Sequence, residues 1–298
     1  MMNGNCATGW RVWLLAARPR TLGASIAPVI MGTAMAYADG GFHAPTALAT
    51  LLCAILIQIE ANYANDYFDF LKGADTEARL GPTRATASGL VTPAQMRNAT
   101  LVVLALAMLL GLYLAWRGGW PILTIGALSV IFAALYTGGP YPLGYLGLGE
   151  VFVLIFFGPV AVGGTYYVQT LEWRLLPTIA GLAPGLISCA ILAVNNLRDI
   201  DEDRRTGKRT LAARFGPVFA RWEYAACLFS GAGIIFFLLV FCADSHNAFV
   251  EGLLAICVPM PVLRRVFRET GPALNACLAT TGKLLLVLSL LFSLGWLL

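Results

Sequence analysis

Long apolar segments recur along the whole chain of 298 residues, and they constrain the fold more than any other feature. Representative runs cover 101–116, 121–136, 151–168, 231–242 and 284–298. An α-helix needs roughly 20 apolar residues to cross about 30 Å of hydrocarbon, and each run comes near that length. The runs leave no room for a separate soluble domain, so we interpret residues 1–298 as a single transmembrane domain.

The composition excludes several classes of protein. Hydrophobic residues make up 58% of the chain and charged residues 12%, whereas a soluble domain is about 45–50% apolar and about 25% charged. A typical cytosolic enzyme, a disordered tail and a nucleic-acid-binding protein are therefore excluded. The seven cysteines form no C-x-x-C pair, so neither a disulfide nor a zinc framework is expected.

Hydropathy and loop signals together predict an all-α polytopic membrane protein. The nine predicted transmembrane helices cover about 21–38, 46–66, 99–116, 120–137, 150–169, 178–199, 222–242, 248–263 and 282–298. With the N-terminus in the cytoplasm and the C-terminus outside, every lysine and arginine except Arg117 and Arg174 falls on the cytoplasmic side. This positive-inside bias favours both the orientation and the count.

The two long cytoplasmic loops, 67–98 and 199–220, follow spans that end in similar groups of amide and carboxylate side chains. The first acidic motif consists of Asn62, Asn65, Asp66 and Asp69, and the second of Asn195, Asn196, Asp199 and Asp203. In each motif an asparagine precedes an aspartate by four residues, and a second aspartate follows three or four residues later. On a helix these intervals place the side chains on one face, so two facing motifs would form a strongly anionic pocket.

Carboxylates crowded at a membrane boundary repel one another and are poorly solvated, so this pocket needs a cation. Hard oxygen ligands with few histidines or cysteines favour Mg²⁺, which binds one or two carboxylates together with water and substrate phosphates. The pattern therefore predicts a phosphorylated ligand. Basic residues that could meet the remaining charge of a diphosphate follow both motifs: Lys72, Arg79 and Arg84 after the first, Lys208 and Arg209 after the second.

Some of the acids have a simpler explanation. For Asp75, Glu77, Asp201 and Glu202, a solvated cap at a helix end explains the charge as well as a functional role does. The four paired aspartates of the two motifs are harder to attribute to solubility, because matching groups end two spans about half a chain apart. We therefore take Asp66, Asp69, Asp199 and Asp203 as the candidate catalytic residues.

The two motifs resemble the aspartate-rich motifs of the UbiA superfamily of intramembrane prenyltransferases. The resemblance rests on Asn65-Asp66-x-x-Asp69 and Asp199-x-x-x-Asp203, and it runs from about Trp13 to the last span. Longer ordered blocks, such as KGADTEARLGP and NNLRDIDEDRRTGKRTL, are similar to the bacterial branch of the family that acts in menaquinone synthesis. In the wider superfamily a third aspartate follows the second by four residues, but here that position is Gly73 and the acid comes at Asp75.

This resemblance implies nine helices around a central cavity open to lipid, with the loops 67–98 and 199–220 as a cytoplasmic cap. It implies transfer of a polyprenyl group from polyprenyl diphosphate to 1,4-dihydroxy-2-naphthoate, with decarboxylation, in the bacterial inner membrane. Two Mg²⁺ ions would be bound by Asp66, Asp69, Asp75, Asp199 and Asp203. The diphosphate would contact Arg20, Lys72, Arg84, Lys208, Arg209, Asn62, Asn65 and Asn196. Candidate walls of the acceptor cavity are Tyr136, Tyr141 and Tyr145.

Other functions remain open at this stage. A sister prenyltransferase with 4-hydroxybenzoate, homogentisate or a tetrapyrrole as acceptor would carry similar motifs. A secondary transporter also contains intramembrane acids, but those lie near the bilayer midplane, whereas these lie at one face. A transferase of the phosphatidyl-alcohol type also uses aspartates and a divalent metal, but its Asp-Gly-x-x-Ala-Arg opening does not occur here.

Overall fold

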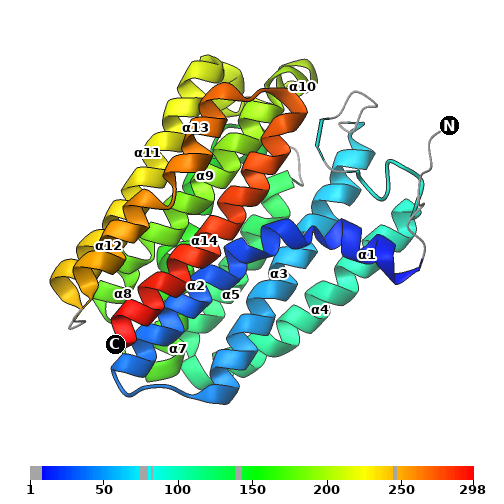
Figure 1. Cartoon of the computed structure of the whole chain (residues 1–298). Coiled ribbons are helices and arrows are strands. Elements are labelled where there is room, and N and C mark those ends of the chain that lie inside the picture. The colour runs from blue at the N-terminus through cyan, green and yellow to red at the C-terminus, as the bar shows by residue number, and fades with distance from the viewer. Residues whose placement is uncertain (1–8, 74–79, 82, 138–142, 244–246) are drawn as a thin grey trace.

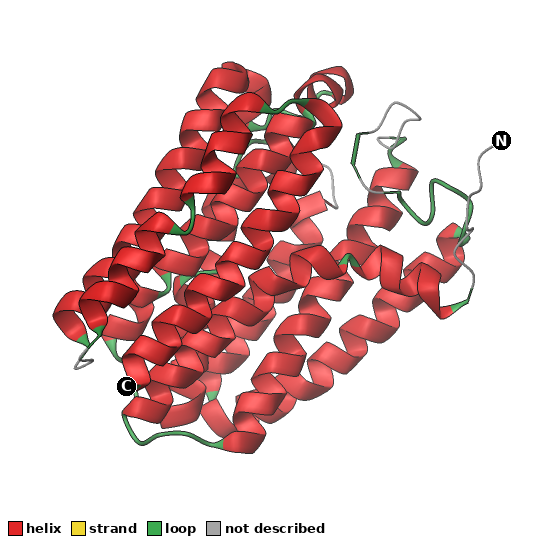
Figure 2. Cartoon of the chain, in the orientation of Figure 1, coloured by secondary structure: helices red, strands yellow, loops and turns green. Residues whose placement is uncertain are grey.

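The computed structural model of the chain describes residues 9–73, 80–81, 83–137, 143–243 and 247–298. Every regular element in these ranges is a helix, as Figure 2 shows. The long helices are α2 (Pro19–Ala38), α3 (Ala44–Leu71), α4 (Pro93–Gly118), α5 (Trp120–Thr137), α11 (Leu211–Cys242) and α14 (Leu274–Leu297). The predicted all-α fold is thus confirmed.

Three further passes along the bundle are each made of two shorter helices. These pairs are α6 (Gly149–Phe156) with α7 (Pro159–Thr170), α8 (Leu175–Ala180) with α9 (Leu182–Arg198), and α12 (Ala248–Cys257) with α13 (Met260–Arg268). The remaining elements are α1 (Trp10–Ala17), α10 (Ile200–Thr206) and the 3-10 turns η1 (Leu143–Tyr145) and η2 (Gly271–Ala273).

The breaks between α6 and α7 and between α8 and α9 pack against each other through glycine. A Cβ atom added to Gly158 would lie 2.7 Å from the carbonyl oxygen of Gly181 and 3.2 Å from the Cα of Gly185. Only residues without a side chain allow backbones to approach so closely in a membrane helix bundle. Pro159 begins α7 at a position where its missing N–H is not needed.

The predicted count of nine transmembrane helices is slightly too high when only long apolar segments are counted. Among the described residues, seven segments are long and apolar enough to cross a membrane: 19–38, 44–71, 93–118, 149–170, 175–198, 211–242 and 271–297. The predicted span 248–263 is divided at Pro259 into helices of 10 and 9 residues, and the second of them carries three arginines. The predicted span 120–137 coincides with helix α5, in which 120–133 is an apolar stretch of the described residues. Length and composition therefore identify a multi-pass membrane protein with fewer continuous spans than hydropathy predicted.

The bundle is built from pairs of neighbouring helices. Helix α11 packs on α9, α14 on α2, α3 on α4, and α2 also contacts α3 and α7. In Figure 1, α9, α11, α13 and α14 form one side of the molecule and α3 and α4 the other, with α2 crossing between them. The largest hydrophobic core lies on the first side, where Tyr166, Tyr224 and Phe292 are among the fully buried side chains.

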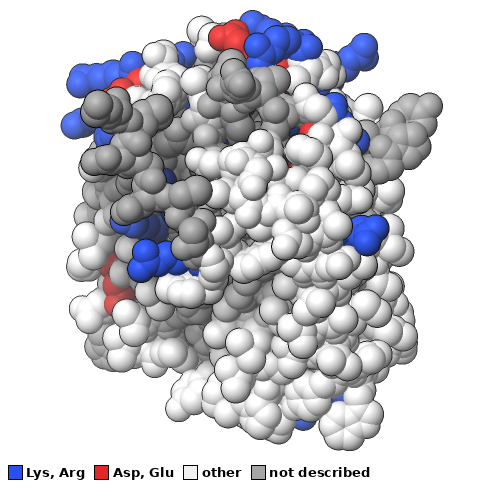
Figure 3. Space-filling model, turned by 90° about the vertical axis from the view of Figure 1, so that its right-hand side faces the viewer, with Lys and Arg blue, Asp and Glu red and all other residues white. Residues whose placement is uncertain are grey.

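The two acidic motifs lie at the same end of the bundle. The last turn of α3, the end of α9 and α10 lie at the top of Figure 1, whereas the C-terminus lies at the opposite end. In Figure 3 charged side chains gather at this top end and in a few patches about halfway down, and the lowest part of the face shown is almost free of them. Both acidic motifs therefore lie at the end of the bundle where charged side chains are concentrated.

Both long loops are shorter than predicted because the flanking helices extend further. Helix α3 continues to Leu71, and α4 begins at Pro93 behind a capping box. In this box the Thr92 hydroxyl accepts from the Gln95 N–H, while the Gln95 side chain accepts from the Thr92 N–H, so two free amides at the helix start are satisfied. The second loop contains α10 and leaves 207–210 as its main non-helical part.

Candidate active site

The last turns of α3 hold Asp66 and Asp69 on one buried face, as their spacing predicts. Their exposed fractions are 1% and 3%. The Asp66 carboxylate accepts hydrogen bonds from the backbone N–H groups of Ala85 (2.9 Å) and Thr86 (3.0 Å). The loop after α3 therefore folds back over the helix end, and Asp66 anchors it there.

Asp69 contacts residues from three different segments of the chain. The Arg84 guanidinium donates to one Asp69 oxygen at 2.6 Å, and both side chains are buried. The other oxygen lies 3.9 Å from the Lys208 ammonium and accepts a 3.4 Å hydrogen bond from the Tyr145 hydroxyl. Because Lys208 follows the second motif, this carboxylate links segments that lie far apart in the sequence.

The Tyr145 ring is flanked by two lysines. The Lys72 ammonium lies 4.9 Å from the ring centroid and the Lys208 ammonium 4.7 Å, distances at which a cation is attracted to an aromatic face. Partial burial lowers the pKa of Lys72, Asp69 opposes the shift, and Lys208 lowers the pKa further. Two ammonium groups beside one ring make this part of the site positive, which favours the binding of an anion. The Arg209 backbone N–H donates to the Tyr145 carbonyl at 2.8 Å, while the Arg209 side chain is exposed.

Asp199 lies at the junction of α9 and α10, and its neighbour Arg198 neutralises it. The Arg198 guanidinium donates to both carboxylate oxygens, at 2.7 and 2.5 Å. It also donates to the side-chain oxygens of Asn195 (2.9 Å) and Asn275 (2.7 Å). Asn275 in turn donates to the Leu80 carbonyl at 2.9 Å. The second motif is therefore tied both to α14 and to the loop that follows the first motif.

Asp203 is buried on α10, with 6% of its surface exposed. Its carboxylate accepts a 3.1 Å hydrogen bond from the Thr210 hydroxyl. Burial raises the pKa of Asp203 to about 6, against the opposing effect of Lys208. The carboxyl group thus titrates close to neutral pH when no cation is bound.

The predicted asparagines mainly hold neighbouring helices. Asn62 donates to the Ala17 carbonyl (2.9 Å) and to the Thr21 hydroxyl (3.3 Å), so it joins α3 to the junction of α1 and α2. Asn196 donates to the Glu150 carboxylate at 3.0 Å and joins α9 to α6. Asn65 is half-buried on α3.

The other predicted residues lie outside this cluster or outside the described residues. Arg20 is exposed and lines an open hollow of about 740 Å³ between α2 and α14, together with Lys283 and Asn275. Asp75 and Tyr141 lie outside the described residues, and so does the side chain of Tyr136.

The donor set fits a magnesium ion by its chemistry. Asp66, Asp69, Asp199 and Asp203 offer hard oxygen ligands, and Mg²⁺ takes one or two carboxylates and completes its shell with water and phosphate oxygens. No group of three or more His, Cys, Asp or Glu side chains that could hold a metal occurs among the residues described. The structure therefore does not gather the four aspartates into one metal-binding group, and Asp69 and Asp199 are paired with Arg84 and Arg198 instead.

Sequence reasoning missed three residues of this site. Arg198 was counted only as one of many basic residues on the cytoplasmic side, although its place directly before Asp199 is a usable signal. The Thr210 hydroxyl caps the start of α11 and also donates to Asp203. Its position before an apolar run indicates the capping role but not the contact with Asp203. Glu150 gave no signal, because its contact with Asn196 joins residues 46 positions apart.

Comparisons with known proteins show the family to which the chain is similar. The sequence pattern described as the UbiA prenyltransferase family matches residues 25–287. A 1,4-dihydroxy-2-naphthoate octaprenyltransferase from Escherichia coli (strain K12) is 40% identical over 296 residues, which cover 96% of this chain and 94% of that protein. The protein of the same name from Mycobacterium tuberculosis is 40% identical, over 91% of this chain and 96% of its own length.

The fold also matches solved structures. A UbiA homolog from Archaeoglobus fulgidus bound to GPP and Mg²⁺ superposes with a TM-score of 0.65 at 14% sequence identity, covering 96% of this chain and 99% of that one. At this identity the likeness concerns the fold alone, and it extends over nearly all of both chains.

Proposed function

This chain belongs to the UbiA prenyltransferase family, and from that membership we propose that it prenylates 1,4-dihydroxy-2-naphthoate. The donor would be a polyprenyl diphosphate and the product demethylmenaquinol, the precursor of menaquinone. Two relatives named for this acceptor, each 40% identical over at least nine-tenths of the chain, support the assignment. The observation that carries it structurally is the contact of Asp69, from the first motif, with Lys208, which follows the second motif.

The diphosphate would bind between the two motifs. Lys72 and Lys208 both lie against the Tyr145 ring, and two positive charges at this place suit an anion carrying several negative oxygens. Arg84 is already held beside Asp69 and would donate to the diphosphate when that carboxylate binds an ion. The amides of Asn62, Asn65 and Asn196, and the more distant Arg20 and Arg209, are assigned supporting roles in this proposal.

The metal would be held by Asp66, Asp69, Asp199 and Asp203, with Asp75 as a further candidate, and we propose two Mg²⁺ ions. Bound magnesium supplies Lewis-acid withdrawal of electrons from the diphosphate, which weakens the allylic C–O bond. The chain's own cations, Lys72 and Lys208 foremost, stabilise the negative charge that develops on the departing diphosphate. The Tyr145 ring contacts both lysines, and its hydroxyl donates to Asp69.

The bond changes balance without a covalent intermediate on the protein. The naphthalenediol carbon that bears the carboxylate forms a bond to the allylic carbon as diphosphate leaves with the C–O electron pair. The carboxylate then departs as carbon dioxide, and the electrons of its C–C bond restore the aromatic ring. The residues walling the acceptor, with Tyr136, Tyr141 and Tyr145 as candidates, would exclude water from the allyl cation.

We further propose that the protein lies in the bacterial inner membrane with the acidic motifs at the cytoplasmic end. The N-terminus would then be cytoplasmic and the C-terminus outside. The segments between α3 and α4 and between α9 and α11 would form a cap over the site. The charged end in Figure 3 and the positive-inside pattern support this orientation.

Purified protein in detergent, incubated with farnesyl diphosphate and 1,4-dihydroxy-2-naphthoate, tests the proposal. Magnesium should give prenylated product and stoichiometric carbon dioxide, and EDTA should stop both. Prenylation of 4-hydroxybenzoate or homogentisate instead would move the protein to a sister branch. Turnover with no membrane potential would also dispose of the carrier alternative, whereas no turnover with any acceptor would refute the proposed reaction.

A further inference from the structure

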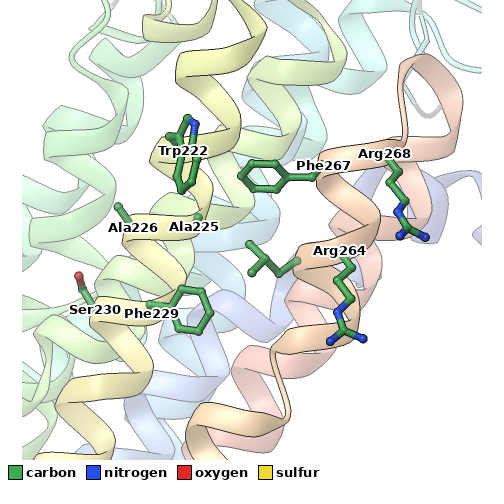
Figure 4. A pocket seen from close by; sticks show the side chains of 9 residues that line it. Trp222, Ala225, Ala226, Phe229, Ser230, Arg264, Phe267 and Arg268 are labelled. Atoms are coloured by element: carbon green, nitrogen blue, oxygen red, sulfur yellow. The ribbon is translucent and has the colours of Figure 1, made fainter.

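An open groove lies between α11 and α13, apart from the acidic motifs. It has a volume of about 630 Å³, within the usual range for ligand pockets. In Figure 4 its α11 wall carries Trp222, Ala226 and Phe229 and its α13 wall carries Phe267, while the side chains of Arg264 and Arg268 extend from the outer side of α13. The proposed prenyl transfer does not use any of these residues.

The floor and walls of the groove are apolar. The Trp222 side chain is 63% exposed and meets the edge of Phe267, with ring centroids 5.3 Å apart and an interplanar angle of 81°. Small Ala225 and Ala226 deepen the groove beside Phe229. Tryptophan at the rim of a membrane helix is typical of the boundary between hydrocarbon and headgroups. The groove is therefore apolar and open enough to hold a hydrocarbon chain close to the boundary between hydrocarbon and headgroups.

The rim of the groove is strongly basic. Arg264 and Arg268 are four residues apart, so both project from one side of α13, and both are exposed. Within the described part of the chain neither has an ion-pair partner, and none of the lining residues is acidic. The nearby Arg221 uses its guanidinium on the carbonyls of Val266 and Glu269, which fixes the end of α13. A guanidinium at the membrane boundary is stabilised by an anion, and this groove supplies none itself.

We propose that the groove between α11 and α13 binds an anionic phospholipid. One acyl chain would lie along Trp222, Ala226 and Phe229, and the headgroup phosphate would accept hydrogen bonds from Arg264 and Arg268. Arginine pairs recognise phosphate oxygens with good geometry, and basic pockets between membrane helices favour anionic headgroups. A second copy of the chain fits less well, because a two-fold contact would bring these arginines against their symmetry mates.

Native mass spectrometry of the full-length protein in detergent tests this site. Wild-type protein would be titrated with dioleoyl phosphatidylglycerol or dioleoyl phosphatidylcholine. The double variant Arg264→Gln/Arg268→Gln should weaken phosphatidylglycerol binding at least tenfold, the loss expected from two charge-assisted hydrogen bonds. The control Arg97→Gln/Arg265→Gln removes the same charge from the same end of the molecule, in part from the same helix, and should bind as the wild type does.

A second variant separates the groove from general electrostatics. Ala226→Trp fills the exposed apolar wall without removing charge and should also weaken binding, while prenyl transfer in detergent stays at the wild-type rate. Equal affinity for the two lipids, or equal losses in the arginine variant and its control, would overturn the proposal. A dimer that Ala226→Trp converts to a monomer, with no lipid preference, would assign the face to a contact between copies and would overturn it too.

Discussion

Replacing Asp66 with alanine should destabilise the protein as well as inactivate it. The carboxylate is 1% exposed and accepts from the Ala85 and Thr86 backbone amides at 2.9 and 3.0 Å. A hydrogen bond to a charged group contributes about 1.5–3 kcal/mol, so the loss of two sets a scale of about 3–6 kcal/mol. Because both amides belong to the loop over the end of α3, most of this loss should appear as opening of that loop.

Two measurements on Asp66→Ala test this reasoning. Denaturant unfolding in detergent should give a lower free energy of unfolding for the variant than for the wild type. Hydrogen exchange should accelerate more at the Ala85 and Thr86 amides than at other amides. Asp201→Ala is the matched control, since Asp201 is an exposed acid on α10, and it should leave both measurements unchanged. If Asp66→Ala lost less than about 1 kcal/mol with the loop still protected, Asp66 would not be the anchor that its two hydrogen bonds indicate.

Three further outcomes follow from the site. Arg84→Ala leaves the buried Asp69 carboxylate without its 2.6 Å partner and should lower stability by about 3–5 kcal/mol; adding Asp69→Asn should restore part of it, and strictly additive losses in a double-mutant cycle would contradict the coupling. Lys208→Ala should raise the KM for prenyl diphosphate about 10–100-fold, with Lys208→Arg less affected; an unchanged KM would remove Lys208 from the diphosphate site. Asp203, with a pKa of about 6, must lose its proton to bind a cation, so activity should fall as the pH drops through about 6 and high magnesium should oppose the fall. The raised pKa also means that the folded state binds this proton more tightly than the unfolded state does. The free energy of unfolding should therefore increase as the pH falls from about 6 toward the ordinary pKa of aspartate. The variant Asp203→Asn should abolish both the fall in activity and this gain in stability.

The sequence predicted the first acidic motif better than the second. Asp66 and Asp69 are three residues apart on a continuous helix, so the predicted common face is the buried face that the structure has. Asp199 and Asp203 are four residues apart, but α9 ends at Arg198 and α10 begins at Ile200. Periodicity assumes an unbroken helix, and nothing in the hydropathy of this stretch marks the break.

Hydropathy located the spans well, yet it overestimated how many are continuous. A moving average over apolar residues does not register the break at Pro259, and it counts 248–263 as one segment although α13 carries arginines on its exposed side. The contacts that assemble the site could not be predicted from the hydropathy pattern either. The Lys208 contact with Asp69 and the Asn275 contact with Leu80 join residues more than 100 positions apart, and neither leaves a local signal.

The acids of this site occupy positions that are unfavourable for negative charge until a partner arrives. Asp66 and Asp69 lie in the last turns of α3, where the helix macrodipole repels an anion, whereas Asp199 both follows the last residue of α9 and precedes the first residue of α10, so the two helix dipoles oppose each other there. Burial adds to that penalty, so each carboxylate needs donors in the ligand-free protein, and Arg84, Arg198 and two backbone amides provide them. The basic residues near the two motifs are therefore as necessary for folding as the acids are for binding. Loss of activity in an arginine variant alone will not distinguish the two roles, whereas a variant that removes arginine and aspartate together separates stability from catalysis.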